Sequence, residues 1–367
     1  MNTHRNNETK SILDGLIELF SRNRQWLLFF GTGTSCALDT GFGMPELTNS
    51  LNIQMGGETE WTQIQSLLEA GISLEGALTG VGLSTEMKSR IQKATGDYIA
   101  KIDREVRDEV LLGKRPWVGE TLVKALVRRL PPLNPRLPIV TANYDMLIEY
   151  ACARHGIRYT TGFYGETIRK WDWEQAKDSL NQCRLIREGM KSFVLIDPLP
   201  HVELFKVHGS INLFTKGNQQ IECDLWSEAV PDGLARVIAA PGDQKYEQYT
   251  NIMDTAARAN RAQDEAMAFA MIGYGFKDRH LHERIYGRVR SQDCPLLVLT
   301  RDLADESITE LRALSKGVWI LLASKRSNGD IDESQTCVYS PSLETPIILN
   351  NDRLWRSDCF AERIIGG

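Results

Sequence analysis

The stretch Trp26-Leu27-Leu28-Phe29-Phe30-Gly31-Thr32-Gly33-Thr34-Ser35 decides the fold that the sequence predicts. Its first half is a continuous apolar run, which is typical of a β-strand covered on both faces. Glycines follow at positions 31 and 33, and a glycine turn between a strand and a helix brings backbone N–H groups close to a phosphate. The stretch therefore predicts the first strand of a parallel sheet and an anion-binding turn. The same residues would also suit a tight connection without a ligand, in which Thr34 or Ser35 caps the helix.

Short apolar runs of the same kind recur along the chain and alternate with helical stretches. This alternation predicts an α/β fold with a Rossmann-like parallel sheet. The apolar runs are 138–141, 204–207, 236–240, 268–272, 295–300 and 318–323, and the helical stretches are 146–155, 250–264, 278–289 and 302–314.

The pattern changes in the segments that flank or interrupt this alternation. Long charged segments with helical spacing fill residues 46–130, whereas residues 160–190 look irregular, with a short helix over the site. We predict a Rossmann-like domain built from residues 1–45 and 131–324, a helical insert or small domain at 46–130, and a C-terminal accessory β element at 325–367.

Composition restricts the classes of function. The chain holds 43 Lys and Arg against 48 Asp and Glu, for a formal net charge of -5, so we expect no direct nucleic-acid binding. Its apolar runs fall far short of the ~20 residues that span a bilayer, so we expect a cytoplasmic protein without membrane contact. The seven cysteines are scattered and never spaced as CxxC, which predicts neither a disulfide framework nor a zinc site.

A second motif, Thr141-Ala142-Asn143-Tyr144-Asp145, follows a predicted strand, where open α/β sheets place their ligands. Asn143 there suits a hydrogen bond to a ribose hydroxyl or a water, and Asp145 suits a cap on the next helix. Both residues acting only as caps is the alternative, since Asn and Asp are common at such turns.

Two further motifs follow strands later in the chain. His208, in Lys206-Val207-His208-Gly209-Ser210, is a natural base at a ligand edge because its ordinary pKa lies nearest neutrality, although a lone histidine is more often structural. The stretch Met271-Ile272-Gly273-Tyr274-Gly275-Phe276-Lys277-Asp278 repeats the strand-then-glycine arrangement and offers a second backbone approach to a nucleotide.

Taken in order, GTGTS, Gly43-Met44-Pro45, TANYD, KVHGS and IGYGFKD resemble the sirtuin superfamily, and more closely its bacterial sirtuin-like NAD hydrolases. The resemblance spans roughly residues 25–300. It implies that Asn143 and His208 are catalytic. It also implies an NAD site formed by Gly31, Thr32, Gly33, Ser35, Met44, Pro45, Asp145, Gly273, Tyr274, Gly275 and Thr300.

Departures from the deacylase pattern narrow this expectation. Deacylases of the superfamily carry two CxxC pairs that hold zinc, whereas here only Cys223 occupies that stretch. They also follow Gly-x-Pro with Asp-Phe-Arg, whereas here Glu46-Leu47 follow Pro45. We therefore expect NAD as a substrate, hydrolysed to nicotinamide and ADP-ribose, and no zinc. The alternatives are a deacylase, an ADP-ribosyltransferase, or a subunit that senses NAD or ADP-ribose without chemistry.

The resemblance also implies a biological setting. Bacterial sirtuin-like hydrolases of this kind belong largely to antiphage defence, where they deplete NAD once triggered. We expect a homo-oligomer controlled by a separate sensor or activator, with a HerA-like hexameric ATPase or a short Argonaute as candidates by family analogy alone.

Overall fold

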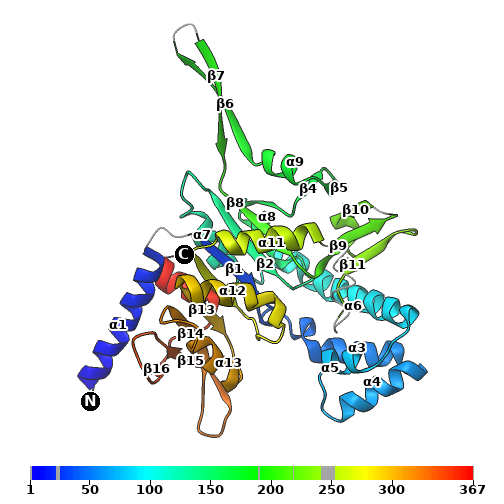
Figure 1. Ribbon diagram of the computed structural model, residues 1–367, viewed down its shortest axis with the longest axis horizontal. Helices are drawn as coiled ribbons and strands as arrows, with labels where there is room; N and C mark the ends of the chain where they lie inside the picture. Colours follow the sequence, from blue (N-terminus) through cyan, green and yellow to red (C-terminus); the bar gives the residue numbers. More distant parts are fainter. Residues whose placement is uncertain (1, 22–24, 189–190, 218, 241–252, 367) are drawn as a thin grey trace.

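The computed structural model describes residues 2–21, 25–188, 191–217, 219–240 and 253–366. A nine-stranded sheet organises the molecule, with the strand order β16-β15-β14-β13-β12-β1-β2-β8-β3 (Figure 1). Its strands are β1 (Trp26–Phe30), β2 (Arg136–Thr141), β3 (Arg158–Thr160), β8 (His201–Lys206), β12 (Ala268–Ile272), β13 (Leu296–Thr300), β14 (Val318–Lys325), β15 (Ile331–Tyr339) and β16 (Ile347–Leu349).

The order of the parallel strands identifies the architecture. From β8 through β2, β1, β12 and β13 to β14, all neighbours pair in parallel. This is the doubly wound order, in which the chain leaves β1 toward one side of the sheet and later returns to build the other side. The predicted Rossmann-like α/β fold is confirmed, and β1 lies at the point where the strand order reverses.

Helices cover both faces of this sheet, because alternate side chains of each strand point to opposite faces. Leu28 and Phe30 of β1 pack with one group of helices, whereas Leu27 and Phe29 pack with the other. The first group comprises α1 (Asn2–Ser21), the second half of α6 (Thr85–Leu111), α7 (Glu120–Val127), α8 (Leu147–Arg154) and α14 (Ser357–Phe360). The second comprises α9 (Trp173–Asp178), α11 (Met253–Glu265), α12 (Arg279–Gln292) and α13 (Asp305–Arg312). The first residues of the predicted helix 250–264, at 250–252, lie outside the described residues.

A separate small core lies among the helices that follow β1. The short α2 (Gly33–Cys36) leads to α3 (Met44–Met55), α4 (Thr59–Glu69) and α5 (Leu74–Gly80). These last three helices and the first half of α6 bury their own apolar residues, among them Trp61, Ile64 and Met87. The second half of α6 packs on the sheet instead, so this helix connects the two cores. The division into domains at 45, 130 and 324 stays a prediction.

The predicted irregular stretch at 160–190 is wrong, because 15 of its 31 residues lie in strands and six more lie in α9. A five-stranded sheet has the order β11-β9-β10-β5-β4, and its neighbours pair in antiparallel fashion. The apolar run 236–240, predicted for the parallel sheet, also contributes to it. Its strands are β4 (Phe163–Gly165), β5 (Arg169–Trp171), β9 (Gly209–Lys216), β10 (Gln219–Glu222) and β11 (Ala235–Ile238).

The remaining strands, β6 (Asn181–Glu188) and β7 (Lys191–Pro198), pair only with each other and form a hairpin that projects from the body (Figure 1). The predicted short helix exists as α9, but it does not lie over the carboxyl ends of the strands. Trp173 and Lys177 of α9 share a pocket with Asn134 and His201, near the residues where β2 and β8 begin.

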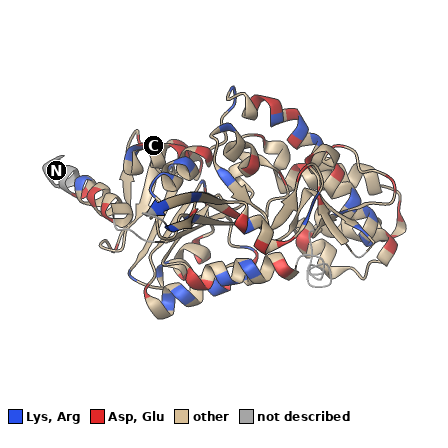
Figure 2. Cartoon of the chain, turned by 90° about the horizontal axis from the view of Figure 1, so that it is seen from above, with Lys and Arg blue, Asp and Glu red and all other residues tan. Residues whose placement is uncertain are grey.

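Charge is mixed over the surface. Figure 2 shows Lys and Arg interleaved with Asp and Glu along the outer helices. None of the described helices is long and apolar enough to cross a membrane.

Candidate active site

The four sequence motifs all lie at one edge of the parallel sheet. Gly31 follows β1, Asn143 follows β2, His208 follows β8 and Gly273 follows β12. These strands are adjacent and parallel in the order β12-β1-β2-β8, so their carboxyl ends meet at the same edge. The fold therefore brings together residues that are up to 242 positions apart in sequence (273 − 31).

The glycines of the first turn allow it to contact the turn after β12. Gly31 N donates to Ile272 O and Gly33 N donates to Gly273 O, both at 2.9 Å. A Cβ at Gly31 or Gly33 would lie 2.6 or 2.7 Å from Gly273 O, which is too close for any side chain. These N–H groups are therefore engaged within the protein, and the glycines serve close packing of the two turns. Thr32 and Gly33 are nonetheless exposed at the sheet edge.

Asn143 joins the first turn to the second. Its Nδ2 donates to Gly31 O at 3.1 Å and to Ser35 Oγ at 3.0 Å. Ser35 Oγ in turn donates to Asp145 Oδ2 at 2.7 Å. Both hydrogens of the Asn143 amide nitrogen are engaged. Oδ1 lies 3.5 Å from the Thr32 hydroxyl, which donates to it, and its second lone pair can accept from a water or a ligand hydroxyl. Asn143 is not a cap of α8, whereas Asp145 Oδ1 does accept from Leu147 N at 3.3 Å.

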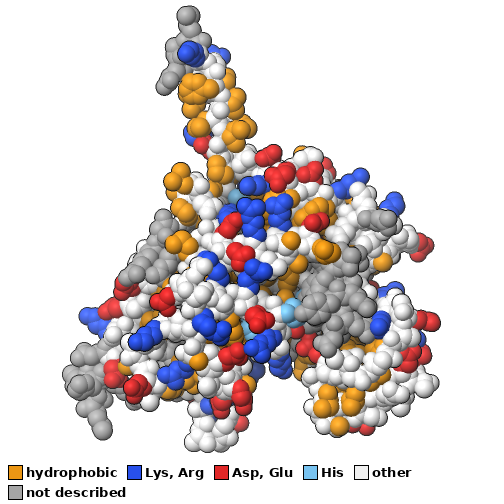
Figure 3. All heavy atoms as spheres, viewed as in Figure 1, with side chains coloured by type: hydrophobic (Ala, Val, Ile, Leu, Met, Phe, Trp, Pro, Cys, Tyr) orange, Lys and Arg blue, Asp and Glu red, His pale blue; other side chains and the backbone are white. Residues whose placement is uncertain are grey.

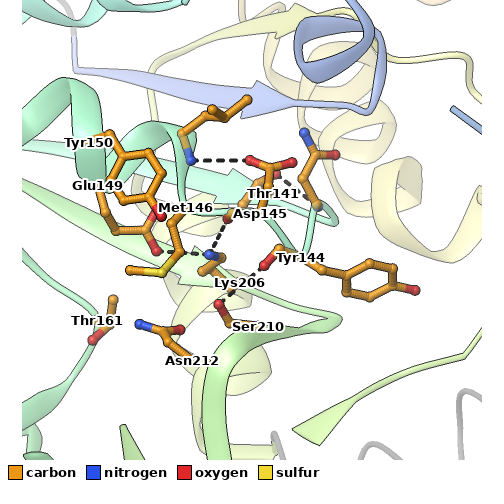
Figure 4. A network of polar contacts seen from close by, with 12 residues as sticks. Thr141, Tyr144, Asp145, Met146, Glu149, Tyr150, Thr161, Lys206, Ser210 and Asn212 are labelled. Carbon is orange, nitrogen blue, oxygen red and sulfur yellow. Dashed lines mark hydrogen bonds and ion pairs between the residues drawn. The ribbon is translucent and has the colours of Figure 1, made fainter. Parts of the chain in front are cut away.

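A buried charged network lies directly beneath the second motif (Figure 4). Lys206 Nζ is 2.8 Å from Glu149 Oε1 and also donates to the backbone carbonyl of Asp145. Asp103, from α6, accepts from Met146 N at 2.9 Å and from the Tyr150 hydroxyl at 2.5 Å. The network thus fixes the backbone of residues 145 and 146 from both sides, which holds Asn143 and Asp145 in place.

Burial dominates the electrostatics of this network. It raises the pKa of Asp103 to about 7, with the hydrogen bonds from Met146 and Tyr150 opposing the shift. Burial likewise raises the pKa values of Asp145 and Glu149, against the attraction of the Lys206 ammonium. Lys206 therefore faces three buried carboxyl groups, all with raised pKa values, and that of Asp103 is raised to about 7.

His208 lies in a turn that only glycine can continue. The histidine is buried, with 3% of its surface exposed, and its carbonyl accepts from Ala239 N at 2.8 Å. Gly209 has φ +81°, and a Cβ there would lie 2.1 Å from Val237 O. The His280 ring, at the start of α12, stacks near the His208 ring with centroids 6.3 Å apart. The imidazole ring of His280 is therefore a direct neighbour of the candidate base.

Tyr144 connects the second and third motifs. Its hydroxyl donates to the carbonyl of Ala239, and its own carbonyl accepts from Ile211 N at 3.0 Å and Ser210 Oγ at 3.3 Å. The turns that carry Asn143 and His208 are thus held in a fixed relationship.

A cleft of about 500 Å³ opens beside the first turn. Among the predicted site residues, Gly33, Gly273 and Thr300 line it. Sequence reasoning missed several of its other walls. Val118 comes from the helical region, Arg301 follows Thr300 at the end of β13, and the C-terminal tail supplies Glu333, Trp355, Arg356 and Ser357.

The structure does not bring every predicted residue to this cleft. Met44 and Pro45 are exposed at the start of α3 and do not line it. The side chain of Tyr274 is buried, and its hydroxyl donates to Asp278 O at 2.9 Å, so only its backbone faces the sheet edge. Gly275 is exposed, with nothing within 4 Å of a Cβ built on it.

Lys206 was also missed as part of the site, although its signal was present. A lysine inside an otherwise apolar strand, Leu204-Phe205-Lys206-Val207, requires a buried partner. Among the described residues, no group of three or more His, Cys, Asp or Glu could hold a metal ion.

Comparison with known proteins gives one family match. Residues 138–302 match the family model of the SIR2-like domain, which is less than half of the 367 residues. The match includes the motifs that carry Asn143, His208 and Gly273, and leaves out the first glycine turn. No curated protein matches the sequence.

Two solved structures are similar over most of the chain. One is described as the structural basis for the mechanism and regulation of Sir2 enzymes. It is 10% identical, covers 83% of this chain and 90% of its own, and has a TM-score of 0.41. The other is described as the structural basis for sirtuin substrate affinity. It is 12% identical, covers 80% of this chain and 88% of its own, and has a TM-score of 0.35.

Proposed function

We propose that this chain hydrolyses NAD at the bond between nicotinamide and ribose, releasing nicotinamide and ADP-ribose. The observation that carries the proposal is that Asn143 and His208 follow the adjacent strands β2 and β8, at the edge where Gly33 and Gly273 border a cleft. Support also comes from the SIR2-like family match, which contains both residues.

The cleft suits the adenosine and phosphate end of NAD. Arg301, Arg356 and Trp355 line it, and the two guanidinium groups also pair with the carboxylates of Glu333 and Asp358, at 2.7 and 2.6 Å. Guanidinium groups suit phosphate oxygens, and an aromatic ring suits a base. Held there, a dinucleotide can extend past the exposed Thr32 and Gly33 and bring its ribose toward Asn143. Binding energy remote from the reacting carbon then positions the ribose.

Asn143 acts as the positioning group for water. Both hydrogens of its amide nitrogen are engaged by Gly31 and Ser35, so Oδ1 accepts a hydrogen bond from the attacking water or from a ribose hydroxyl. The Asn143 side chain is bonded to the turn after β1, and its backbone belongs to the turn after β2. This fixed position suits a group that must orient a nucleophile.

His208 acts as the general base. The bond between ribose C1′ and nicotinamide nitrogen breaks, and its electron pair leaves with nicotinamide, which becomes neutral. Water adds to C1′ of the oxocarbenium-like centre, and His208 takes the proton that the water loses. A general base of this kind contributes on the order of 10²- to 10⁴-fold to the rate.

Unregulated NAD hydrolysis would be toxic, so we further propose that the activity is controlled. By the sirtuin-like resemblance, the chain would act in antiphage defence as an oligomer switched by a separate partner, with a HerA-like ATPase as the candidate. Pulling down the native protein and identifying what co-purifies tests this part.

The catalytic proposal is tested by following nicotinamide release from NAD by chromatography. We expect release by the wild-type chain, alone or with its partner, and a loss of about 100-fold or more in Asn143→Ala and His208→Ala. Asn328→Ala, in an exposed turn, is the matched control and keeps full activity. Tight binding with NAD intact would instead support a sensing subunit. Release only with an acetylated lysine peptide would support a deacylase, and labelling of protein by labelled NAD would support an ADP-ribosyltransferase.

A further inference from the structure

The β6–β7 hairpin is a separate two-stranded element, joined by eight residue pairs from Asn181–Pro198 to Glu188–Lys191. Within the described chain, no third strand pairs with it. A two-stranded hairpin alone is marginally stable in water, and a long strand edge with unpaired backbone groups is a template for another strand. The hairpin therefore presents a structure that a further strand would complete.

Both faces of the hairpin carry exposed apolar side chains, and Figure 3 shows such side chains gathered along the projecting element from one side. On one face Leu185 lies opposite Val194, and each is 61% exposed, beside Ile196 at 60%. On the other face, Phe193 and Leu195 are 44% and 38% exposed. Contiguous exposed apolar residues on a projecting element are typical of an interaction surface.

The two edges differ in charge. β6 carries Arg184 and Arg187 against a single acidic residue, Glu188, so pairing β6 with a second β6 would bring together two strands of net positive charge. The β7 edge instead holds an apolar run, Phe193 to Ile196, between Lys191 and Asp197. Opposite charges at the two ends of a strand favour antiparallel pairing with a second copy of itself.

One register satisfies both the charges and the apolar residues. If Val194 lies opposite Val194 of a second copy, Phe193 lies opposite Leu195, and Lys191 lies opposite Asp197 at both ends. Arg184 of the same hairpin contacts Asp197 through Oδ2 alone, which leaves Oδ1 for the incoming lysine. Moving the register by two residues in either direction loses both charge pairs.

We infer that two copies of this chain associate through β7, about a two-fold axis at Val194, to form a continuous four-stranded antiparallel sheet. The two β7 strands occupy the centre of that sheet, and each β6 lies at an outer edge. The apolar face of Leu185, Val194 and Ile196 is then continuous across the two copies. This assembly is independent of the NAD site, because the hairpin carries none of its residues.

A cysteine placed on the axis tests the register directly. In a Cys183→Ser background, Val194→Cys faces itself across the axis, so mild oxidation should give a disulfide-linked dimer of the full chain. Ser192→Cys, two residues away on the same face, would lie opposite Ile196 and should not cross-link. Linkage at both positions, or at neither, overturns the inference.

Sedimentation of the full-length chain gives the second measurement. The wild type should sediment as a dimer or a larger even-numbered assembly. Val194→Lys, which places two like charges opposite each other, should halve that mass. Leu185→Lys makes the same change on the same face but on the outer strand, and it should keep the wild-type mass. A monomeric wild type, or a Val194→Lys variant of unchanged mass, contradicts the inference. The hairpin would then be a candidate binding surface for a different protein.

Discussion

The Nδ2 of Asn143 donates a hydrogen bond of 3.0 Å to the Oγ of Ser35 and thereby ties the turn after β2 to the turn after β1. The Ser35 hydroxyl in turn donates a hydrogen bond to the buried carboxylate of Asp145. A hydroxyl that accepts from one site residue and donates to another fixes both, so Ser35 acts through its neighbours as a positioning residue.

Replacing Ser35 with alanine should therefore reduce both activity and stability. The change removes the acceptor of Asn143 and the donor to Asp145, which costs about 1–3 kcal/mol of unfolding free energy. Loss of the fixed Asn143 position should lower kcat for nicotinamide release by about 10- to 100-fold. Ser66→Ala, on the exposed face of α4, is the control. An unchanged kcat in Ser35→Ala would show that Asn143 does not depend on this contact.

Gly33 and Gly275 allow a matched test of packing. A Cβ at Gly33 would lie 2.7 Å from Gly273 O, whereas a Cβ at Gly275 meets nothing within 4 Å. Gly33→Ala should lower the unfolding free energy by about 2 kcal/mol or more, and Gly275→Ala should change it by less than about 0.5 kcal/mol. Urea unfolding followed by circular dichroism measures both. Equal effects would mean that the two turns are not in contact.

Removing the buried Lys206 ammonium should destabilise the fold, because the Glu149 carboxylate loses its partner. Lys206→Met leaves Glu149 without its partner and should cost about 3–5 kcal/mol of unfolding free energy. Lys206→Met combined with Glu149→Leu removes both charges and should recover most of that loss. A double-mutant cycle by urea unfolding gives the coupling energy, and a double variant as unstable as the single one would refute the pairing.

Asp103 should make stability depend on pH. Its pKa in the folded chain is raised to about 7, above the ordinary value of 3.8, so the folded state holds a proton that the unfolded state has lost. That contribution is fully present below the unfolded value and is lost as pH rises through about 7.

Replacing Asp103 with asparagine should flatten this dependence. Between pH 5 and 8, the slope of unfolding free energy against pH should be smaller in Asp103→Asn by up to about one proton per molecule. The raised pKa values of Asp145 and Glu149 act in the same direction and remain in the variant. Unfolding midpoints across this pH range measure the difference, and parallel curves would rule out Asp103 as the titrating group.

Arg301 should affect substrate binding without affecting the fold. Its side chain is 62% exposed, lines the cleft and pairs with Glu333 at 2.7 Å. Arg301→Ala should raise KM for NAD about two- to fivefold and leave kcat and the unfolding midpoint unchanged. Arg326→Ala, on the same part of the sheet but away from the cleft, is the control. A lowered kcat with unchanged KM would place Arg301 outside the binding site.

Local patterns in the sequence were sufficient for the α/β class and for the position of the motifs at strand ends. Continuous apolar runs report strands buried on both faces, and the residues that follow such strands in a parallel sheet must meet at one edge. The antiparallel sheet of β4, β5, β9, β10 and β11 was not predicted. β4 and β5 are only three residues each and include exposed residues, and the apolar run of β11 reads the same whether its strand joins a parallel or an antiparallel sheet. For the first of these reasons residues 160–190 looked irregular.

The sequence by itself determined that Gly31, Asn143, His208 and Gly273 share an edge of the sheet, since strand direction alone requires it. Only the tertiary structure decided what these residues contact. It showed that the glycines of the first turn pack against Gly273, that Lys206 holds the second motif from beneath, and that the C-terminal tail closes the cleft. The physical reason is that periodicity records whether a residue is buried, but not which distant segment buries it.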